Sequence, residues 1–462
     1  MPSSRTHSLD DLLREAIASH KAGQRQAAES GYRAVIGAEP GHAEANHNLG
    51  VLMMQAGQTE QGLVHLGRAL KSDVNQALYY ISYARALLMA GNPAKAGAVL
   101  EQGRLAGFGD GRFDALQLQV RDATSKPDTP HSLDLLGSAL LAESKVEDAV
   151  QAYRKALAID PDFADAHFHL GWALSEYGDV ATGFAHYMRR AALVYGRAKA
   201  PAGDQPEPSY KVSHDRQQRD YLAGGTAPAD APQIRDMFHL ADGSRVEGPA
   251  VNPANANPGL FDAWAAASPQ LVVMDDFLTL PALEKLRSFC AGSTIWRKLY
   301  DAGYLGAAPE DGFACPLLAQ IVEEIRENFR PILKSEPLRY LGAFKYDSEN
   351  CAGTNTHADN SALNVNFYIA PDEANLDPEH GGMEIWDLAA PDVEAQRKYS
   401  SNENLLRDLL KSSGAKRTIV PHRSNRAVIF RSGLYHKTDT FKFKSDYLSR
   451  RINISMLFGQ LG

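Results

Sequence analysis

The sequence predicts a multidomain protein in which an all-α solenoid of helical hairpins precedes an α+β part built on a double-stranded β-helix (jelly roll). Three observations predict this fold class. Leucine–glycine pairs recur inside amphipathic helical patterns in the first 195 residues. The stretch that follows is rich in proline, glycine and alanine and loses this periodicity. Beyond Leu338, short runs with strand-like alternation are separated by turn residues.

The N-terminal part contains an internal repeat. Gly50, Gly137 and Gly171 each follow a leucine inside a helical pattern, and the last two lie 34 residues apart. Tyr153 and Pro161 then fall where a second helix needs an aromatic residue and a stop. Small residues let two antiparallel helices approach closely, and each hairpin must stack on a neighbour to bury its apolar face. The pattern resembles the tetratricopeptide repeat.

Five repeats are predicted within an array that spans 8–195. Their ranges are 9–42, 43–76, 77–110, 130–163 and 164–195. The array is interrupted near 107–130, where the spacing departs from the repeat period. The glycines between Gly107 and Gly111 follow a helix rather than a strand, so a loop break is expected there and not a phosphate-binding loop.

A linker is predicted at 196–262, with one or two helical turns at 217–222, and the α+β part at 263–462. Leu271–Met274 is the expected first strand, and helices are expected from Pro281 to Cys290 and from Pro316 to Arg330. Further strands are expected at 341–346, 363–370, 383–387, 417–421, 426–430, 434–438 and 451–458. A helical insertion from Val393 to Ser412 interrupts them.

A candidate metal site begins at His357-Ala358-Asp359. Two residues that are two apart on a strand point to the same face, so His357 and Asp359 can hold one ion from one side. His436, 79 residues after His357 in a strand-rich run, is the best third ligand. Two histidines and a carboxylate that leave coordination positions open are the arrangement of non-haem Fe(II) oxygenases. The alternative for the His-x-Asp pair by itself is a surface turn.

A candidate anion-binding residue lies on the last strand. Alternation places Arg451, Asn453 and Ser455 on one face and the apolar residues on the other. An inward arginine needs an anionic partner, and a dicarboxylate offers bidentate geometry. Arg450 falls on the apolar face and is expected to extend outward to solvent. The alternative for Arg451 is an internal salt bridge.

Together these motifs resemble the prolyl-4-hydroxylase-like branch of the 2-oxoglutarate/Fe(II) oxygenases over about residues 268–462. The ordered motifs are Leu271 to Leu286, Tyr346, His357-x-Asp359-Asn360, Asn364 to Ile369, Gly381-Gly382, Asn425 to Phe430, His436 and Arg451-x-Asn453. Halogenase relatives replace the carboxylate with a small residue, whereas Asp359 is present here. Two features depart from the pattern: the 15-residue spacing from His436 to Arg451 and the insertion at 388–416.

The resemblance implies specific roles. His357, Asp359 and His436 would bind Fe(II), and Arg451 would hold the distal carboxylate of 2-oxoglutarate. Cosubstrate-pocket positions are matched by Tyr346 and Tyr368, for which ordinary strand packing is the alternative, and Asn453 is a further candidate in that pocket. The implied cofactors are Fe(II) and 2-oxoglutarate, with ascorbate as a third candidate. The implied reaction is oxidative decarboxylation of 2-oxoglutarate coupled to hydroxylation of a C–H bond.

Three functions are compatible with this organisation. The first is an oxygenase that hydroxylates a protein or peptide recruited by the repeats. The second is a small-molecule oxygenase whose repeats serve oligomerisation, and the third is a non-catalytic repeat scaffold on a degenerate oxygenase fold. The sequence indicates neither the substrate nor the oligomeric state.

Composition bears on partners and location. The formal net charge of −8 argues against a nucleic-acid partner. The sequence contains no run of about 18 apolar residues, so no membrane span is expected. The polar N-terminus shows no secretory signal, and the three cysteines form no paired motif, so a cytoplasmic location is expected. Cys351 is expected to be a packed thiol, and His380 and His422 are expected to be polar loop residues.

Overall fold

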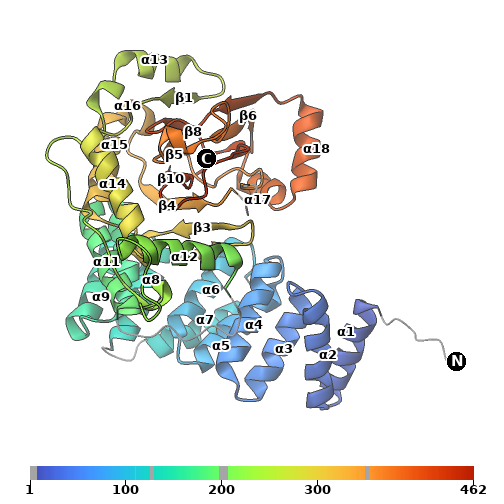
Figure 1. Cartoon of the computed structure of the whole chain (residues 1–462). Coiled ribbons are helices and arrows are strands. Elements are labelled where there is room, and N and C mark those ends of the chain that lie inside the picture. Colours follow the sequence, from blue (N-terminus) through green and yellow to red (C-terminus); the bar gives the residue numbers. More distant parts are fainter. Residues whose placement is uncertain (1–7, 110, 125–128, 197–206, 349–352, 462) are drawn as a thin grey trace. The chain divides into compact units, whose positions relative to one another are not determined.

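The structure is a computed structural model that describes residues 8–109, 111–124, 129–196, 207–348 and 353–461 (Figure 1). The chain divides into two compact units, Met1–Ala166 and His167–Gly462. The predicted array ends at 195, but the division between the units lies at 166–167, near the start of the repeat predicted at 164–195. Each unit is described below by itself.

The N-terminal unit is a row of helical hairpins. Its helices are α1 (Leu9–Lys21), α2 (Arg25–Ala38), α3 (Ala43–Gln55), α4 (Thr59–Ser72), α5 (Ala77–Met89), α6 (Pro93–Leu105), α7 (Gly111–Thr124), α8 (Pro130–Ala142) and α9 (Val146–Ile159). A Cβ atom at Gly137 of α8 would collide with the ring of Tyr153 on α9. The small residue therefore sits at a close helix approach, as the repeat pattern predicts, and the first four predicted hairpins are confirmed.

The interruption of the repeats contains a helix that the sequence analysis missed. Phe113, Leu116 and Val120 of α7 are buried in one cluster with α5 and α6. A Cβ atom at Gly103 of α6 would collide with the Phe113 ring, so the two helices lie close together. Gly107 and Gly109 follow α6 in the expected loop, and Gly111 begins the extra helix α7.

The C-terminal unit begins with the fifth predicted hairpin and continues as an α+β fold. Its helices include α10 (Ala164–Tyr177), α11 (Val180–Tyr195), α12 (Ser209–Leu222), α13 (Pro258–Ala266), α14 (Leu280–Gly292), α15 (Pro316–Asn328), α16 (Arg330–Leu333), α17 (Val393–Ser400) and α18 (Glu403–Ser413). Its strands are β1 (Leu271–Met274), β2 (Lys298–Tyr300), β3 (Tyr304–Ala307), β4 (Leu338–Tyr346), β5 (Leu363–Tyr368), β6 (Met383–Ala389), β7 (Arg417–Val420), β8 (Ala427–Arg431), β9 (Leu434–Thr438) and β10 (Ile452–Phe458). The predicted strands are present, and β2 and β3 were not predicted.

The strands form two antiparallel sheets. The larger has the order β1-β8-β5-β10-β4-β3-β2 and the smaller the order β7-β6-β9. In the larger sheet Asn453 of β10 lies opposite Tyr368 of β5 and Phe344 of β4. The sheets are not closed into a barrel, so the double-stranded jelly roll remains a prediction.

The two faces of the larger sheet differ in polarity. Val365, Phe367, Ile454 and Met456 belong to one large buried cluster with apolar residues of α14 and α15, and these helices lie along one side of the strands in Figure 1. The alternate residues of β5 and β10, including Asn364, face the other way and line a cavity. The period of two along each strand thus separates a packed face from a polar one.

Most of the predicted linker is folded. Gln218 of α12 donates a 2.8 Å hydrogen bond to the carbonyl oxygen of Ser293, and Glu324 of α15 accepts 2.8 and 2.7 Å hydrogen bonds from the backbone amides of Ala250 and Val251. The buried positions of α12 are polar, which is why hydropathy did not reveal a helix there. The described residues from 207 onward therefore pack into the C-terminal unit.

The last hairpin packs into the same unit. Phe184 and Tyr187 of α11 belong to the large buried cluster, and Tyr195 donates a 2.7 Å hydrogen bond to Asp311. Glu176 of α10 is buried and forms an ion pair with Arg339 of β4. The fifth hairpin is thus confirmed as a helical pair and is also part of the C-terminal core.

In the described part of the chain, no helix is both long and apolar enough to span a membrane.

Cys290 and Cys315 are free and buried. The prediction for Cys351 concerns a residue outside the described ranges.

Candidate metal centre

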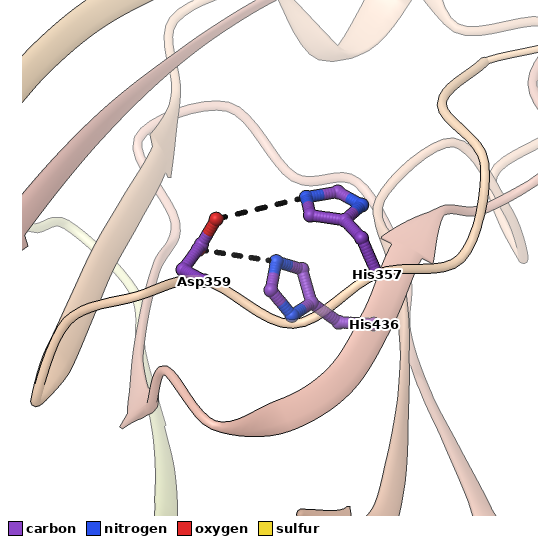
Figure 2. A group of neighbouring side chains, drawn as sticks. All are labelled: His357, Asp359 and His436. Atoms are coloured by element: carbon purple, nitrogen blue, oxygen red, sulfur yellow. Dashed lines mark ion pairs between the residues drawn. The ribbon is translucent and has the colours of Figure 1, made fainter. Parts of the chain in front are cut away.

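The three predicted metal ligands come together in the structure (Figure 2). One ligand atom from each of His357, Asp359 and His436 lies within 4.8 Å of the other two. The Nε2 atom of His357 lies 3.8 Å from Oδ1 of Asp359, and Nε2 of His436 lies 3.4 Å from Oδ2. The two histidine rings are 4.5 Å apart between centroids. The set forms one cluster that could hold a single ion.

Both histidines present the same nitrogen to the centre. Nδ1 of His357 donates to the carbonyl oxygen of Asn355 at 2.8 Å, and Nδ1 of His436 donates to that of Leu434 at 2.8 Å. With Nδ1 protonated, Nε2 keeps its lone pair for a metal. The backbones of the two histidines exchange hydrogen bonds of 2.9 and 2.8 Å, which fixes their separation.

The His-x-Asp segment is not on a regular strand, so that part of the prediction was wrong. His357 forms only an isolated bridge with His436. The polar groups of the intervening Ala358 are instead bound by side chains of α17. The backbone amide donates to Ser400 Oγ at 3.0 Å, and the carbonyl oxygen accepts from Gln396 Nε2 at 2.7 Å. Side chains of the helical insertion thus bind the backbone of Ala358, in addition to the backbone pairing of His357 with His436.

The electrostatics of Asp359 favour a carboxylate. Burial raises its pKa, but the hydrogen bond and charge of His436, with contributions from His357 and Asn364, outweigh burial and lower the pKa of Asp359 to about 2. Asn364 Nδ2 donates to Oδ2 of Asp359 at 2.9 Å. Burial, followed by the neighbouring charge of His436, lowers the pKa of His357. Both shifts favour the deprotonated forms that bind metals.

The centre opens into a cavity of about 490 Å³. One wall is aromatic and comes from β2, β3 and β4. Tyr300 and Tyr304 stack with ring centroids 4.5 Å apart, and Tyr304 stacks on Tyr346 at 4.9 Å. Amide side chains such as Asn366 and Asn453 line another part of the cavity. The space therefore combines a polar floor with a flat aromatic wall, which suits an organic molecule placed beside the metal.

Arg451 lines the same cavity and is buried. Its guanidinium donates to the carbonyl oxygens of Gly381 and Gly382 at 2.7 and 3.1 Å, and to Oδ1 of Asn453 at 2.8 Å. A Cβ atom at Gly382 would collide with the carbonyl oxygen of Val420. Only glycine therefore allows the backbone at 382 to sit where its own carbonyl oxygen reaches Arg451. No ion pair of the described residues includes Arg451, so the internal salt bridge considered as the alternative is not seen there.

Aromatic rings surround the guanidinium. The Arg451 Cζ atom lies 4.6 Å from the ring centroid of Tyr346 and 5.4 Å from that of Tyr368. Tyr346 lines the cavity and its hydroxyl lies 3.4 Å from that of Thr438. The Tyr368 hydroxyl is buried and has no hydrogen-bond partner among the described residues. Tyr368 is not among the residues that line the cavity, whereas Tyr346 and Arg451 are.

Two other residues differ from expectation. Arg450 does not extend to solvent: it is buried and forms a 3.2 Å ion pair with Asp347, because α12 covers this face and its Gln217 accepts a hydrogen bond from Arg450. His422 lies in a loop as expected, but it is buried and stacks on Tyr368 with centroids 5.4 Å apart. Burial, with the charges of Arg451 and Arg426, lowers the pKa of His422 to about 3.

His380 behaves as a partly exposed loop residue, bonded to Asp439 at 3.0 Å. The residues that sequence reasoning missed in the site are Asn364, Gln396, Ser400 and His422. Asn364 and the glycine pair lay inside motifs already noted, so a signal existed for them. Gln396 and Ser400 gave none, because their role depends on a contact with a segment about 40 residues away.

Comparison with known proteins identifies the repeats. Residues 19–81 match the family model "Tetratricopeptide repeat" and residues 137–178 match "TPR repeat". No curated protein matches the chain. The structure of MamA 41-end from Desulfovibrio magneticus RS-1 is 18% identical, covers 41% of this chain and 97% of its own, and gives a TM-score of 0.20. The TPR2B-domain:pHsp70 complex of yeast Sti1 is 18% identical, covers 25% and 96%, and gives 0.24. Neither family match reaches the metal centre.

Proposed function

We propose that the protein is an Fe(II)- and 2-oxoglutarate-dependent oxygenase that hydroxylates a protein or peptide. The convergence of the two histidine Nε2 atoms and the Asp359 carboxylate on one point carries the proposal. This donor set on one side of an ion suits a ferrous site with open positions. The resemblance of the ordered motifs to the prolyl-4-hydroxylase-like oxygenases points to the same chemistry.

The residues around Arg451 fit a dicarboxylate cosubstrate. Arg451 is a buried cation in the cavity that contains the three ligands, and an anion would compensate its charge. The ring of Tyr368 packs near the same guanidinium, but Tyr368 is not among the residues that line the cavity, so Arg451 carries this part of the proposal. Asn453 and the carbonyl oxygens of Gly381 and Gly382 already fix the guanidinium, so binding costs little further ordering.

The chain itself supplies binding, orientation and a partly dry cavity. Bound Fe(II) and 2-oxoglutarate would supply the oxidising chemistry that uses O2 to hydroxylate a C–H bond. Gln396 and Ser400 keep Ala358 in place, so that His357 and Asp359 point at the same ion. Asn364 orients the Asp359 carboxylate. The aromatic wall that includes Tyr300 and Tyr304 excludes water and holds the substrate carbon near the metal.

The tetratricopeptide repeats favour a protein or peptide substrate. Stacked helical hairpins form extended surfaces that commonly bind other proteins. The family matches at 19–81 and 137–178 place such repeats in the same chain as the metal centre. Contacts remote from the iron would then position the reacting C–H bond. A small-molecule substrate, with repeats used for oligomerisation, is the alternative.

A turnover experiment tests the proposal. The full chain is incubated with Fe(II), 2-oxoglutarate, ascorbate and a peptide mixture, and succinate and peptides heavier by one oxygen atom are measured. His436→Ala is the control, because it removes one ligand. The proposal expects both products with the wild type and neither with the variant. Succinate with oxygen added only to small molecules would favour the alternative, and no succinate at all would favour a non-catalytic scaffold.

A further inference from the structure

A second cavity lies on the other face of the strands that carry the cosubstrate residues. It has a volume of about 250 Å³ and is lined mainly by apolar and aromatic groups. Lys345 of β4 and Ile452 of β10 line it and lie opposite each other in the sheet. Their neighbours Tyr346 and Arg451 line the metal-centre cavity instead. Successive strand residues point to opposite faces, so the two cavities are separated by the sheet.

Lys345 is the unusual group in this second cavity. Its side chain is buried, with the residue only 3% exposed. No ion pair or side-chain hydrogen bond of the described residues includes its amine. Its Nζ atom lies 3.6 Å from the ring centroid of Tyr447 and 5.4 Å from that of Trp296. Two ring faces attract the cation but do not replace the hydrogen bonds that water gives an ammonium group.

The nearby acids already have other partners. Asp347 pairs with Arg450 at 3.2 Å, and Asp215 is bound at 2.6 Å by Lys211 and at 2.9 Å by His214. Burial, followed by the charge of Arg450, lowers the pKa of Lys345 well below its usual value, so the surrounding protein does not compensate an ammonium group.

A second cation borders the cavity. Arg287 of α14 lines it and donates to the Ile369 carbonyl oxygen and to the Ser424 hydroxyl. Its neighbours Ser288, Tyr221 and Tyr447 complete a rim that carries no acidic side chain among the lining residues. The residues that line the cavity thus include two basic side chains, apolar walls and no acidic group.

We propose that this cavity, named here the Lys345 pocket, binds a small organic carboxylate with a flat apolar body. The carboxylate would pair with Lys345, and the body would lie against Tyr447 and Ile452. An apolar cavity of about 150 Å³ is enough to hold a benzene ring, so a ring carrying one carboxylate fits the available volume. A buried amine with an anion at contact distance gains a strong charge-assisted hydrogen bond.

Benzoate is the probe, and benzamide, its uncharged analogue of nearly the same shape, is the ligand control. Binding to the full chain is measured by isothermal titration calorimetry. The inference expects benzoate to bind and benzamide to bind at least tenfold more weakly. Lys345→Met should weaken benzoate at least tenfold without unfolding the chain, because methionine has a similar length and removes a buried polar amine that has no hydrogen-bond partner among the described residues. Lys285→Met, which removes a partly exposed cation of helix α14, should leave benzoate affinity unchanged.

Two further variants locate the binding. Ser288→Trp, at an exposed position on the rim, should block the Lys345 pocket without disturbing the core. Arg451→Met should leave benzoate binding intact, because that residue faces the other cavity. Equal benzoate affinity in wild type and Lys345→Met would overturn the inference. Loss of binding in Arg451→Met alone would also overturn it, by placing benzoate in the metal-centre cavity. Neither result depends on whether the chain is an oxygenase.

Discussion

The side-chain amide of Gln396 donates a 2.7 Å hydrogen bond to the carbonyl oxygen of Ala358, the residue between two candidate metal ligands. Ser400, one helical turn further on, accepts from the Ala358 amide at 3.0 Å. The helical insertion predicted from Val393 to Ser412 therefore holds the backbone of the candidate metal centre. Ligand geometry here depends on side chains of α17 as well as on the sheets.

We expect Gln396→Leu to weaken Fe(II) binding several-fold while leaving the fold intact. The variant leaves one partly buried carbonyl oxygen without this partner, a loss of about 1–3 kcal/mol, and it loosens the segment between His357 and Asp359. Metal affinity is measured by competition with a chelator, and stability by thermal unfolding. Arg397→Leu, an adjacent change on the same helix, is the matched control. Equal losses of affinity in both variants would show that α17 matters only for general stability.

Arg450 and Arg451 should respond to substitution in opposite ways. Arg451→Met should weaken 2-oxoglutarate binding by tenfold or more, because the proposed anion partner is lost. Arg450→Met should leave that affinity nearly unchanged but destabilise the fold by about 3 kcal/mol or more, because Asp347 would remain buried without its pair. Binding is measured calorimetrically and stability by denaturant unfolding. The reverse assignment of effects would mean that the proposed role of Arg451 is wrong.

Acid stability should depend on Asp275. The Arg426 guanidinium bonds it at 2.7 Å and Arg423 at 2.8 Å, and the Arg426 hydrogen bond lowers the pKa of this carboxyl despite partial burial. A carboxyl whose pKa is lower in the folded state stabilises the fold at pH values above its unfolded-state pKa of about 3.9. This stabilisation is lost as the pH falls through the folded-state pKa. Asp275→Asn should remove this part of the acid-side decline. The free energy of unfolding of the wild type and of Asp275→Asn is measured across an acidic pH series. Equal dependence on pH in the two proteins would contradict the idea.

The metal-centre fold should need the last hairpin and the segment before residue 263. A fragment covering 263–462 loses the buried rings of Phe184 and Tyr187 and the amides that bind Glu324. Full burial of one large apolar side chain contributes about 1.5–3 kcal/mol, so this fragment should unfold at a much lower denaturant concentration than one covering 164–462. Equal midpoints for the two fragments would show that the predicted boundary at 263 is sufficient.

Local periodicity allowed much of the site to be predicted. Alternation along β10 placed Arg451 and Asn453 on one face, and both line the cavity. Periodicity did not predict the structure of the His357–Asp359 segment, where side chains bind part of the backbone. The His357–Asp359 segment is held by Gln396 and Ser400 rather than by a regular strand.

Helix α12 was predicted only in part, as one or two turns at 217–222, for a different reason. Its buried face consists of Lys211, His214 and Gln218, which have helical spacing but no hydrophobic signal. Within the helix Asp215 bonds Lys211 and His214, and Gln218 reaches the distant Ser293 carbonyl oxygen. Sequence patterning detects apolar faces and cannot detect a buried face made of polar residues.

The central claim is that His357, Asp359 and His436 form one ferrous site. An anaerobic titration of the full chain with Fe(II), followed by measurement of bound iron after removal of free metal, tests it most directly. The account predicts one tightly bound iron per chain for the wild type and its loss in both His357→Ala and Asp359→Ala, with unchanged binding in His380→Ala, a partly exposed histidine outside the cluster. Unchanged iron content in either ligand variant would contradict the claim.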